Sequence, residues 1–448
     1  MMRLLNKMIF IILMILVPCL PFIAACSNSE TPTPIPTPTT DPSPMPTYPP
    51  IPTPTPAPSS LHTPIPSTTQ AEETVKITIG NLSDITGVSG NVMKIINMAL
   101  EDTIEYYNRQ NLIPGVELEI ITYDGQYNSS LDITGYEWLK ENGADLIFTA
   151  VPPTAVTLKP YVEADEMVLF TWAPTQEAIS PPGYVFSPSN TLGEYTGHTL
   201  LKCVADNDPD FPADRPAIIG GAYWIETYGD GILSGAKEYA LAHPEQYEWD
   251  GGYLIELGFN WDSEVEQLKR CDYVLPPVIM ASFVQQYRNA GHQAKFLGTD
   301  AHLGFLDQIN ASDLWDELDG ALFVRINRWW NEDDERVTLA KNLLRENHPD
   351  EAEEIIKMGV GYLAVNGAVV MFEIIADAVE SVGPENFNSQ ALYDAAESFS
   401  YTVDGIERDS FSKTKRTSLN YMGLYEARAA DKDIYRVLPE WYPIVYEP

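Results

Sequence analysis

The sequence predicts an α/β protein with parallel sheets, arranged as two lobes. The first observation is that β-branched strands alternate with helical segments, beginning with VKITIG at 75–80 and a helix within 93–110. The second is that this alternation restarts after Gly193. The third is length, because residues 74–448 exceed what one ordinary hydrophobic core accommodates. Together these observations favour two sheets, each covered by helices on both faces.

The remaining elements follow the same alternation along the chain. We expect further strands at 116–122, 144–150, 166–173, 215–222, 251–257 and 293–301. We expect further helices at 136–143, where Gly143 ends the helix, and at 193–206, 229–243, 262–271 and 281–291. The apolar run 360–375 contains Asn366 and Glu373, so it predicts a buried helix rather than a membrane span.

The amino-terminal residues have the pattern of a secretory signal. Residues 8–25 carry no charge and follow Arg3 and Lys7. The run is also long enough to cross a bilayer, so an uncleaved anchor is an alternative, and a plain secreted protein is another. The sequence Ile23-Ala24-Ala25-Cys26 is similar to a bacterial lipobox. This resemblance implies that residues 1–25 are removed and that Cys26 carries a lipid anchor.

Residues 26–73 predict a disordered linker behind that anchor. Residues 31–68 are mostly Pro, Thr and Ser. Proline fixes φ and lacks an N–H group, so this stretch favours extended polyproline II over helix or sheet. Its position between an anchor and a globular part favours a spacer over a ligand for a proline-binding domain.

Charge and cysteine content limit the classes of partner. The formal net charge of −37 argues against nucleic-acid binding and against adhesion to an anionic membrane surface. The only membrane contact that we expect is therefore attachment through the lipid on Cys26. Of the four cysteines, only Cys203 and Cys271 lie in the globular part. A disulfide between them and two free buried thiols are both compatible with the sequence.

Five segments of the chain together resemble a known protein family in their order and spacing. They are VKITIGNLSDITGVSGN, VELEIITYDGQYN, ETYGDGILSGAKEY, QAKFLGTDA and GYLAVNGAVVMFEIIADAVESVG. In order and spacing they resemble the type 1 periplasmic binding proteins, in particular the solute-binding lipoproteins of branched-chain amino acid (Leu/Ile/Val-like) ABC importers. The resemblance covers about residues 75–445.

The resemblance implies two Rossmann-like lobes joined by a hinge of about three crossings. It places lobe 1 at about 74–192 and 304–405, and lobe 2 at about 193–303 and 406–448. The ligand is expected in the cleft at the carboxyl ends of the strands, which is where open α/β sheets bind ligands.

In lobe 1 the resemblance points to two loops, VPPTAV and WAPTQE. That family holds an amino-acid carboxylate with backbone N–H groups and hydroxyls there, which makes Thr154, Ala155, Ala173 and Thr175 the expected ligand residues. Trp172 is expected to cover an apolar part of the ligand. Helix capping is the alternative role for the threonines. Pro152 and Pro153 cannot donate, so part of the family's cradle is missing.

In lobe 2 the resemblance places the family's ligand-clamping tyrosine at Tyr228. Trp224 in the same loop is a second candidate, and core packing is the alternative for both. That family holds the α-ammonium group of its ligand with an acidic residue just after the next strand. The corresponding segment here is ELGFNWDS, in which Glu256 is the candidate. Asp300 in LGTDA is a further acidic candidate.

Motifs for catalysis are not evident in this sequence. GVGYLA at 359–364 has dinucleotide-type glycine spacing but follows a helical segment rather than a strand. DNDPD at 206–210 lacks the later Gly and Glu of a calcium loop. We therefore expect no enzyme activity, no cofactor and no metal.

The function expected from the sequence is capture of a small polar molecule, an amino acid or a related amide or amine, for an ABC importer. The protein is expected to be extracytoplasmic, anchored to the cell membrane through Cys26 and monomeric, with a transporter permease as partner. A ligand sensor of the same fold is the alternative, and an exported enzyme is a weaker one.

Overall fold

The computed structural model describes residues 74–225, 227–403 and 405–448, without the side chains of Thr227 and Tyr228. The expected signal peptide, the lipidated Cys26 and the Pro/Thr-rich linker lie outside these residues. All described residues fall in the same compact unit of the chain.

The first sheet is parallel and has the strand order β2-β1-β3-β4-β5. Its strands are β1 (Val75–Ser83), β2 (Val116–Asp124), β3 (Leu146–Thr149), β4 (Leu169–Thr171) and β5 (Val185–Phe186). Successive side chains point to opposite faces, as a pleated strand requires. Phe148 and Phe170 enter one core, whereas their neighbours Ile147 and Leu169 enter another.

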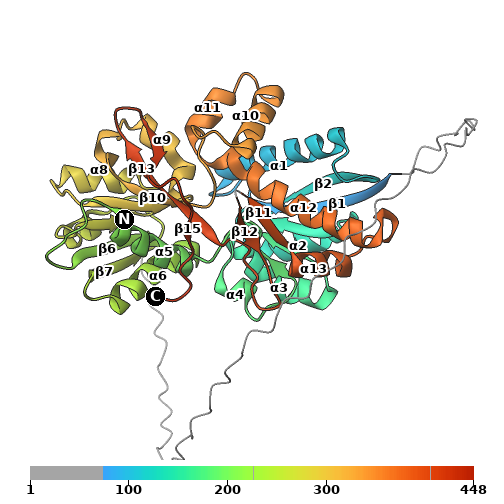
Figure 1. Ribbon diagram of the computed structural model, residues 1–448, viewed down its shortest axis with the longest axis horizontal. Helices are drawn as coiled ribbons and strands as arrows, with labels where there is room; N and C mark the ends of the chain where they lie inside the picture. Colours follow the sequence, from blue (N-terminus) through green and yellow to red (C-terminus); the bar gives the residue numbers. More distant parts are fainter. Residues whose placement is uncertain (1–73, 226, 404) are drawn as a thin grey trace, which may run out of the picture. The chain divides into compact units, whose positions relative to one another are not determined.

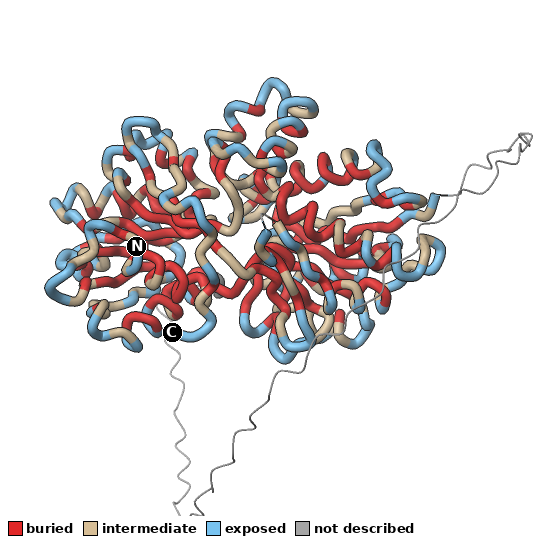
Figure 2. The backbone as a smooth tube through the Cα atoms, viewed as in Figure 1, coloured by how far each residue is buried: buried red, intermediate tan, exposed pale blue. Residues whose placement is uncertain are grey.

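Helices cover both faces of this sheet (Figure 1). One face carries α1 (Gly90–Gln110) and α12 (Val365–Val382), which contact each other, and α10 (Glu335–Asn347) and α13 (Ser389–Ser398) pack beside them. The opposite face carries α2 (Ser129–Glu141), α3 (Pro152–Asp165) and the short α4 (Gln176–Ile179). Figure 2 shows the strands buried and the connecting loops exposed.

The second sheet has the order β14-β13-β10-β9-β8-β6-β7, and β15 pairs with β13. Strands β6 (Ala217–Trp224), β7 (Tyr247–Ile255), β8 (Tyr273–Leu275), β9 (Lys295–Thr299) and β10 (Leu322–Arg325) are parallel. The antiparallel strands are β13 (Tyr421–Arg428), β14 (Asp433–Arg436) and β15 (Tyr442–Pro443). The associated helices are α5 (Gly193–Asn207), α6 (Thr227–Ala242), α7 (Asp262–Gln267), α8 (Ala281–Asn289), η1 (His302–Phe305), α9 (Leu306–Ala311) and η2 (Asp316–Leu318).

Two expected lobe boundaries need correction. A boundary at 304 is too early, because β10 pairs with β9 and β13 in the second sheet, so the chain returns to lobe 1 only after Arg325. A boundary at 406 is also too early. The hairpin of β11 (Ser400–Val403) and β12 (Ile406–Ser410) pairs with neither large sheet, and Phe411 packs on Phe186 of lobe 1. The chain joins the second sheet at Tyr421.

The chain between β10 and β13 contains the longest apolar stretch of the described residues. The span Gly361–Val382 is long and apolar enough to cross a membrane, but 78% of its most apolar window is buried inside the protein. It is the core helix that the sequence predicts. The GVGYLA segment follows α11 (Ala352–Met358) and forms the turn η3 (Gly361–Ala364), so the glycines do not follow a strand. A further turn, η4 (Pro384–Asn386), precedes α13.

Cys203 and Cys271 are both buried and free. Burial raises the pKa of the Cys203 thiol to about 12, so it stays protonated at neutral pH. Of the two arrangements that the sequence left open, the structure has two buried thiols.

Candidate functional site

The carboxyl ends of the two sheets approach each other. Helix α3 follows β3 in lobe 1, α6 follows β6 in lobe 2, and the two helices are in contact. The turn η1, which follows β9, also reaches lobe 1: a Cβ on Gly304 would lie 4.0 Å from Cγ1 of Val92 and 3.7 Å from Cγ1 of Val360. Ligands of open α/β sheets bind at such strand ends, so this cleft is the first candidate site.

The loop between β1 and α1 is held in one conformation by Asp84. This carboxylate is fully buried and accepts from the backbone N–H of Gly87 at 2.5 Å and of Ser89 at 2.8 Å. It also accepts from the Ser89 hydroxyl at 2.7 Å. A carboxylate that accepts several hydrogen bonds fixes a tight turn, so contacts within the chain hold this loop in place.

Asp124, at the end of β2, supports the same loop from outside. It accepts from Ile85 N at 2.9 Å and from the Thr86 hydroxyl at 2.6 Å. Partial burial alone would raise the pKa of Asp124, but the hydrogen bonds from Thr86, Ile85 and Gln126 outweigh it and lower the pKa. The carboxylate therefore stays charged and keeps its contacts over the physiological range.

Thr154 and Ala155 lie in the first turns of α3, which begins with Pro152 and Pro153. Ala155 is fully buried in the lobe 1 core. Thr154 is also buried, and its hydroxyl lies near the carboxyl group of Asp132. Burial raises the pKa of Asp132 to about 6, and the proximity of Thr154 offsets this only in part. Asp132 was not predicted, because the sequence does not show that α2 and α3 place it beside Thr154.

The loop after β4 contains Trp172, Ala173 and Thr175. Thr175 is the N-cap of α4, and its hydroxyl accepts from Ala178 N at 3.3 Å, so it fills the capping role. The N–H of Ala173 donates to the Thr171 hydroxyl at 3.2 Å. Trp172 packs edge-on against Phe148, and its Nε1 has no hydrogen-bond partner among the described residues. This Nε1 is buried against α12, where a Cβ on Gly367 would lie 3.0 Å from it, so the indole N–H does not face an open space.

In lobe 2 the aromatic cluster packs largely against itself. Trp224 is 8% exposed, lies edge-on to Phe259 and donates through Nε1 to the Gly258 carbonyl at 2.8 Å. Glu256 is exposed. Tyr228 lies in the first turn of α6, and its side chain is outside the described residues.

Asp300 joins the ends of two neighbouring strands. Its Oδ1 accepts from Arg325 Nε at 2.9 Å and its Oδ2 accepts from Ile326 N at 2.6 Å. Both oxygens are therefore engaged at the point where the chain leaves lobe 2. This arrangement gives Asp300 a role in holding the hinge.

Exposed apolar side chains lie in the loops that follow strands of both lobes. They are Ile85 (44% exposed) and Val88 (61%) in the β1–α1 loop, and Ile225 (61%), Leu257 (64%) and Phe259 (54%) after β6 and β7. In the sequence these residues are visible only as hydrophobic residues within predicted loops, and none of them was predicted as a site residue. A cleft with apolar margins suits a ligand with an apolar part.

Two cavities among the described residues lie elsewhere, and none of the residues expected to bind ligand lines either one. One of about 550 Å³ lies at the hinge, among the residues after β10, the start of α10, the β11–β12 hairpin and Trp441. The other, also about 550 Å³, is bounded by Trp315, Trp329 and Trp330. In the part of the chain that the structure describes, His, Cys, Asp and Glu side chains form no group suited to a metal ion.

Residues 76–225 match the family model described as periplasmic binding protein. Among solved structures, a branched-chain amino acid ABC transporter protein from Thermus thermophilus with bound valine superimposes with a TM-score of 0.69. The two chains are 19% identical, and the match covers 83% of this chain and 97% of the other. The chain has the type 1 periplasmic binding protein fold. The fold and the family resemblance expected from the sequence are thereby confirmed.

Other structures with this fold belong to proteins described with other solutes. A fatty acid ABC transporter substrate-binding protein from Thermomonospora curvata is 17% identical with a TM-score of 0.68, over 82% of this chain and 92% of the other. A solute-binding protein from Rhodopseudomonas palustris BisB5, in complex with 3,4-dihydroxybenzoic acid, is 14% identical with a TM-score of 0.67. The match covers 83% of this chain and 99% of the other. No curated protein sequence matches significantly. At these identities the likeness shows the fold and leaves the ligand undefined.

Proposed function

We propose that this chain is an extracytoplasmic solute-binding protein that captures a small molecule between its lobes and delivers it to an ABC importer. The observation that carries the proposal is the approach of the two sheets at the carboxyl ends of their parallel strands, where α3 contacts α6 and η1 lies near Val92. The loop held by Asp84 supports it, because an organised loop loses little entropy when a ligand binds.

The solute is proposed to be an amino acid or a related amide or amine that has an apolar part. The loop after β4 places the Thr175 hydroxyl at the start of α4, where the sequence resemblance expects polar contact with the ligand. The exposed Ile85, Val88 and Phe259 favour an apolar portion in the same molecule. Related structures are described with valine, a fatty acid and an aromatic acid, so proteins of this fold bind several classes of solute that have an apolar part.

Membrane attachment is proposed through a lipid on Cys26, followed by the Pro/Thr-rich residues 31–68 as a spacer. Two or more acyl chains give lasting attachment, at roughly 0.8 kcal/mol per buried methylene. Labelling with a radioactive or alkyne-tagged fatty acid tests this. Label is expected on the wild-type chain and not on Cys26→Ser.

A thermal-shift screen of the soluble chain from residue 74 tests solute binding. Ligands that bind only the folded state stabilise it by about 2.7 kcal/mol at a hundredfold excess over Kd. One chemical class among amino acids, amides, amines and aromatic acids is expected to raise the Tm. Thr175→Ala and Tyr228→Ala are expected to reduce that shift.

The matched control is Asn388→Ala. Asn388 caps α13 as Thr175 caps α4, because its side chain accepts from Ala391 N at 3.1 Å. Both substitutions remove a cap worth about 1 kcal/mol, but only Thr175 lies at the cleft. Equal reduction of the ligand shift in both variants would show a general stability effect and count against the site.

The second candidate function is a ligand sensor that signals to a membrane partner. The same cleft and the same anchor suit it. Uptake of the radiolabelled solute by cells that contain or lack the chain separates the two roles. Loss of uptake without the chain is expected of an importer component, whereas unchanged uptake favours a sensor.

A further inference from the structure

The cavity at the hinge contains an unusual concentration of arginine. Its wall includes Arg328, Arg336 and Arg408, together with the aromatic side chains of Tyr401 and Trp441. The remaining lining residues are Asn327, Asp333, Asp334, Glu335, Thr338, Asn366 and Val403. They come from the segment after β10, from α10, from α12 and from the β11–β12 hairpin, so the cavity lies where the chain passes between the lobes.

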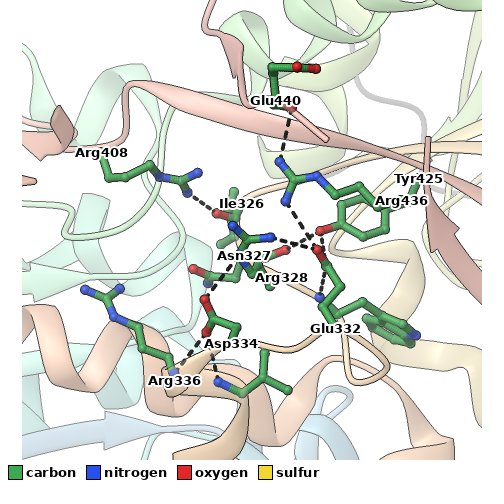
Figure 3. A network of polar contacts seen from close by, with 12 residues as sticks. Ile326, Asn327, Arg328, Glu332, Asp334, Arg336, Arg408, Tyr425, Arg436 and Glu440 are labelled. Atoms are coloured by element: carbon green, nitrogen blue, oxygen red, sulfur yellow. Dashed lines mark hydrogen bonds and ion pairs between the residues drawn. The ribbon is translucent and has the colours of Figure 1, made fainter. Parts of the chain in front are cut away.

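The carboxylates deeper in the hinge are already paired (Figure 3). Asp334 caps α10 by accepting from Arg336 N at 2.9 Å, and it forms an ion pair with Arg328 Nε at 3.1 Å. Glu332 pairs with Arg328 at 3.1 Å and with Arg436 at 3.3 Å. These acids are therefore not counterions for the other two guanidinium groups in the cavity wall.

Arg408 is charged, buried and incompletely satisfied. It is 6% exposed, and its Nη2 donates to the Ile326 carbonyl at 2.7 Å, as Figure 3 shows. Its guanidinium lies over the Trp441 ring, 3.4 Å from the centroid. Its Nη1 has no hydrogen-bond partner among the described residues, nor has it a carboxylate within salt-bridge distance. A buried cation in this state is costly unless an anion accepts from it.

Arg336, on α10, also has a guanidinium stacked on an aromatic ring and an unpaired N–H group. Its guanidinium lies over the Tyr401 ring, 4.6 Å from the centroid, and its Nη2 has no hydrogen-bond partner in the described part of the chain. Two guanidinium groups with unpaired N–H donors thus border one cavity, each stacked on an aromatic ring. Burial also lowers the pKa of Arg408 to about 10, although the negative charge of Asp409 acts in the opposite direction.

The acidic residues of the cavity limit the charge of the ligand. Asp333 and Glu335 line the same cavity and are exposed to solvent. Together with Asp334 they offset positive charge of the arginines in the wall, so a ligand with one negative charge is repelled less than a doubly charged phosphate. The rings of Tyr401 and Trp441 hold the cations in place, because Arg336 lies over Tyr401 and both Arg408 and Arg436 lie over Trp441.

We propose that the hinge cavity binds a small monoanion with a carboxylate group, held by Arg408 and Arg336. This site is separate from the cleft proposed for solute capture, since none of the residues expected there lines it. Because its wall combines the crossing segments with α10 and Trp441, an anion here contacts the elements that join the two lobes.

Calorimetric titration of the soluble mature chain, from residue 27, with benzoate tests the proposal, with inorganic phosphate as the second probe. Saturable benzoate binding is expected, and phosphate is expected to bind more weakly. Arg408→Gln and Arg336→Gln are each expected to weaken benzoate binding tenfold or more, because each removes a charged hydrogen bond. Arg345→Gln is the matched control, since Arg345 lies on the same helix, outside the cavity, and pairs with Glu353.

Unchanged benzoate affinity in both Arg408→Gln and Arg336→Gln would overturn the proposal, as would absence of saturable binding up to millimolar concentration. If Arg408→Gln does not fold, Arg336→Gln decides. The cleft variant Thr175→Ala separates the two sites. Benzoate binding lost in Thr175→Ala but kept in the arginine variants would refute the hinge site and leave the proposed function intact. Benzoate binding that depends on the two arginines, together with no Tm shift for any solute in the screen, would support the hinge site and count against the proposed function.

Discussion

Arg325 and Asp300 form an ion pair across the carboxyl ends of β10 and β9, with Arg325 Nη2 2.7 Å from Asp300 Oδ1. Arg325 is fully buried, and its guanidinium lies over Trp329, 4.4 Å from the ring centroid. The pair thus fixes the exit of β10, from which the chain crosses to lobe 1. It connects a residue expected to bind ligand with the architecture of the hinge.

Asp300→Asn is expected to lower the free energy of unfolding by about 3 kcal/mol, because it leaves a buried guanidinium without its counterion. Urea denaturation measures this. Asp313→Asn is the control, since Asp313 pairs with Lys432 on the surface, where ion pairs contribute about 0–1 kcal/mol. Similar losses in the two variants would contradict the structural role of Asp300.

Asp132→Asn is expected to stabilise the protein above pH 6. The folded-state pKa of about 6 exceeds the unfolded value, so the folded state binds the proton more tightly. Wild-type stability from this group is therefore greatest at low pH and falls as pH rises from about 4 through 6. Asparagine avoids the buried charge, so the variant should equal wild type near pH 4 and exceed it by roughly 1–3 kcal/mol at pH 8. Urea titrations at both pH values test this, and a difference independent of pH would contradict it.

Gly367→Ala is expected to disturb Trp172. A Cβ at Gly367 would lie 2.8 Å from Cε2 and 3.0 Å from Nε1 of the indole, closer than side chains pack. Displacement of the ring should cost roughly 1–3 kcal/mol and change the tryptophan fluorescence. Gly258→Ala is the control, because the nearest atom there is the Glu256 carbonyl oxygen at 3.7 Å. A Gly367→Ala protein as stable as wild type would show that the helix and ring separate freely.

Asp84→Ala is expected to release the β1–α1 loop. Three donors, two of Ser89 and one of Gly87, lose their acceptor. Amide hydrogen exchange of residues 85–89 should accelerate at least tenfold, since local opening is governed by such contacts. Asp319→Ala is the comparison, because Asp319 accepts from one backbone group, Ala429 N, at an exposed position. Exchange at 85–89 that matches wild type would contradict this role.

The sequence predicted the parallel strands well because they are buried on both faces and read as apolar runs. The strand VKITIG and the Ala144–Ala150 segment both appear at the expected places, as β1 and β3. Strand β10 was missed, since LFVR is four residues long and its identity as a strand depends on pairing with β9 and β13. That omission produced the early boundary at 304.

The site was less predictable than the fold. Thr175 fits both a ligand loop and an N-cap, and only the contact with Ala178 N shows that it caps. Arg408 bonds to Ile326, 82 residues away in the chain, so no local pattern indicates its burial. Asp132 is an ordinary first-turn acid in sequence, and its raised pKa results from packing against α3. Properties that depend on distant neighbours require the structure.

The central claim is that a solute binds between the two lobes, and hydrogen exchange with the most stabilising solute from the screen tests it directly. Protection is expected in the loops of both lobes, at 84–90 and 172–176 in lobe 1 and at 225–229 and 256–260 in lobe 2. Protection confined to one lobe, or protection only around Arg408 and α10, would contradict capture in the cleft.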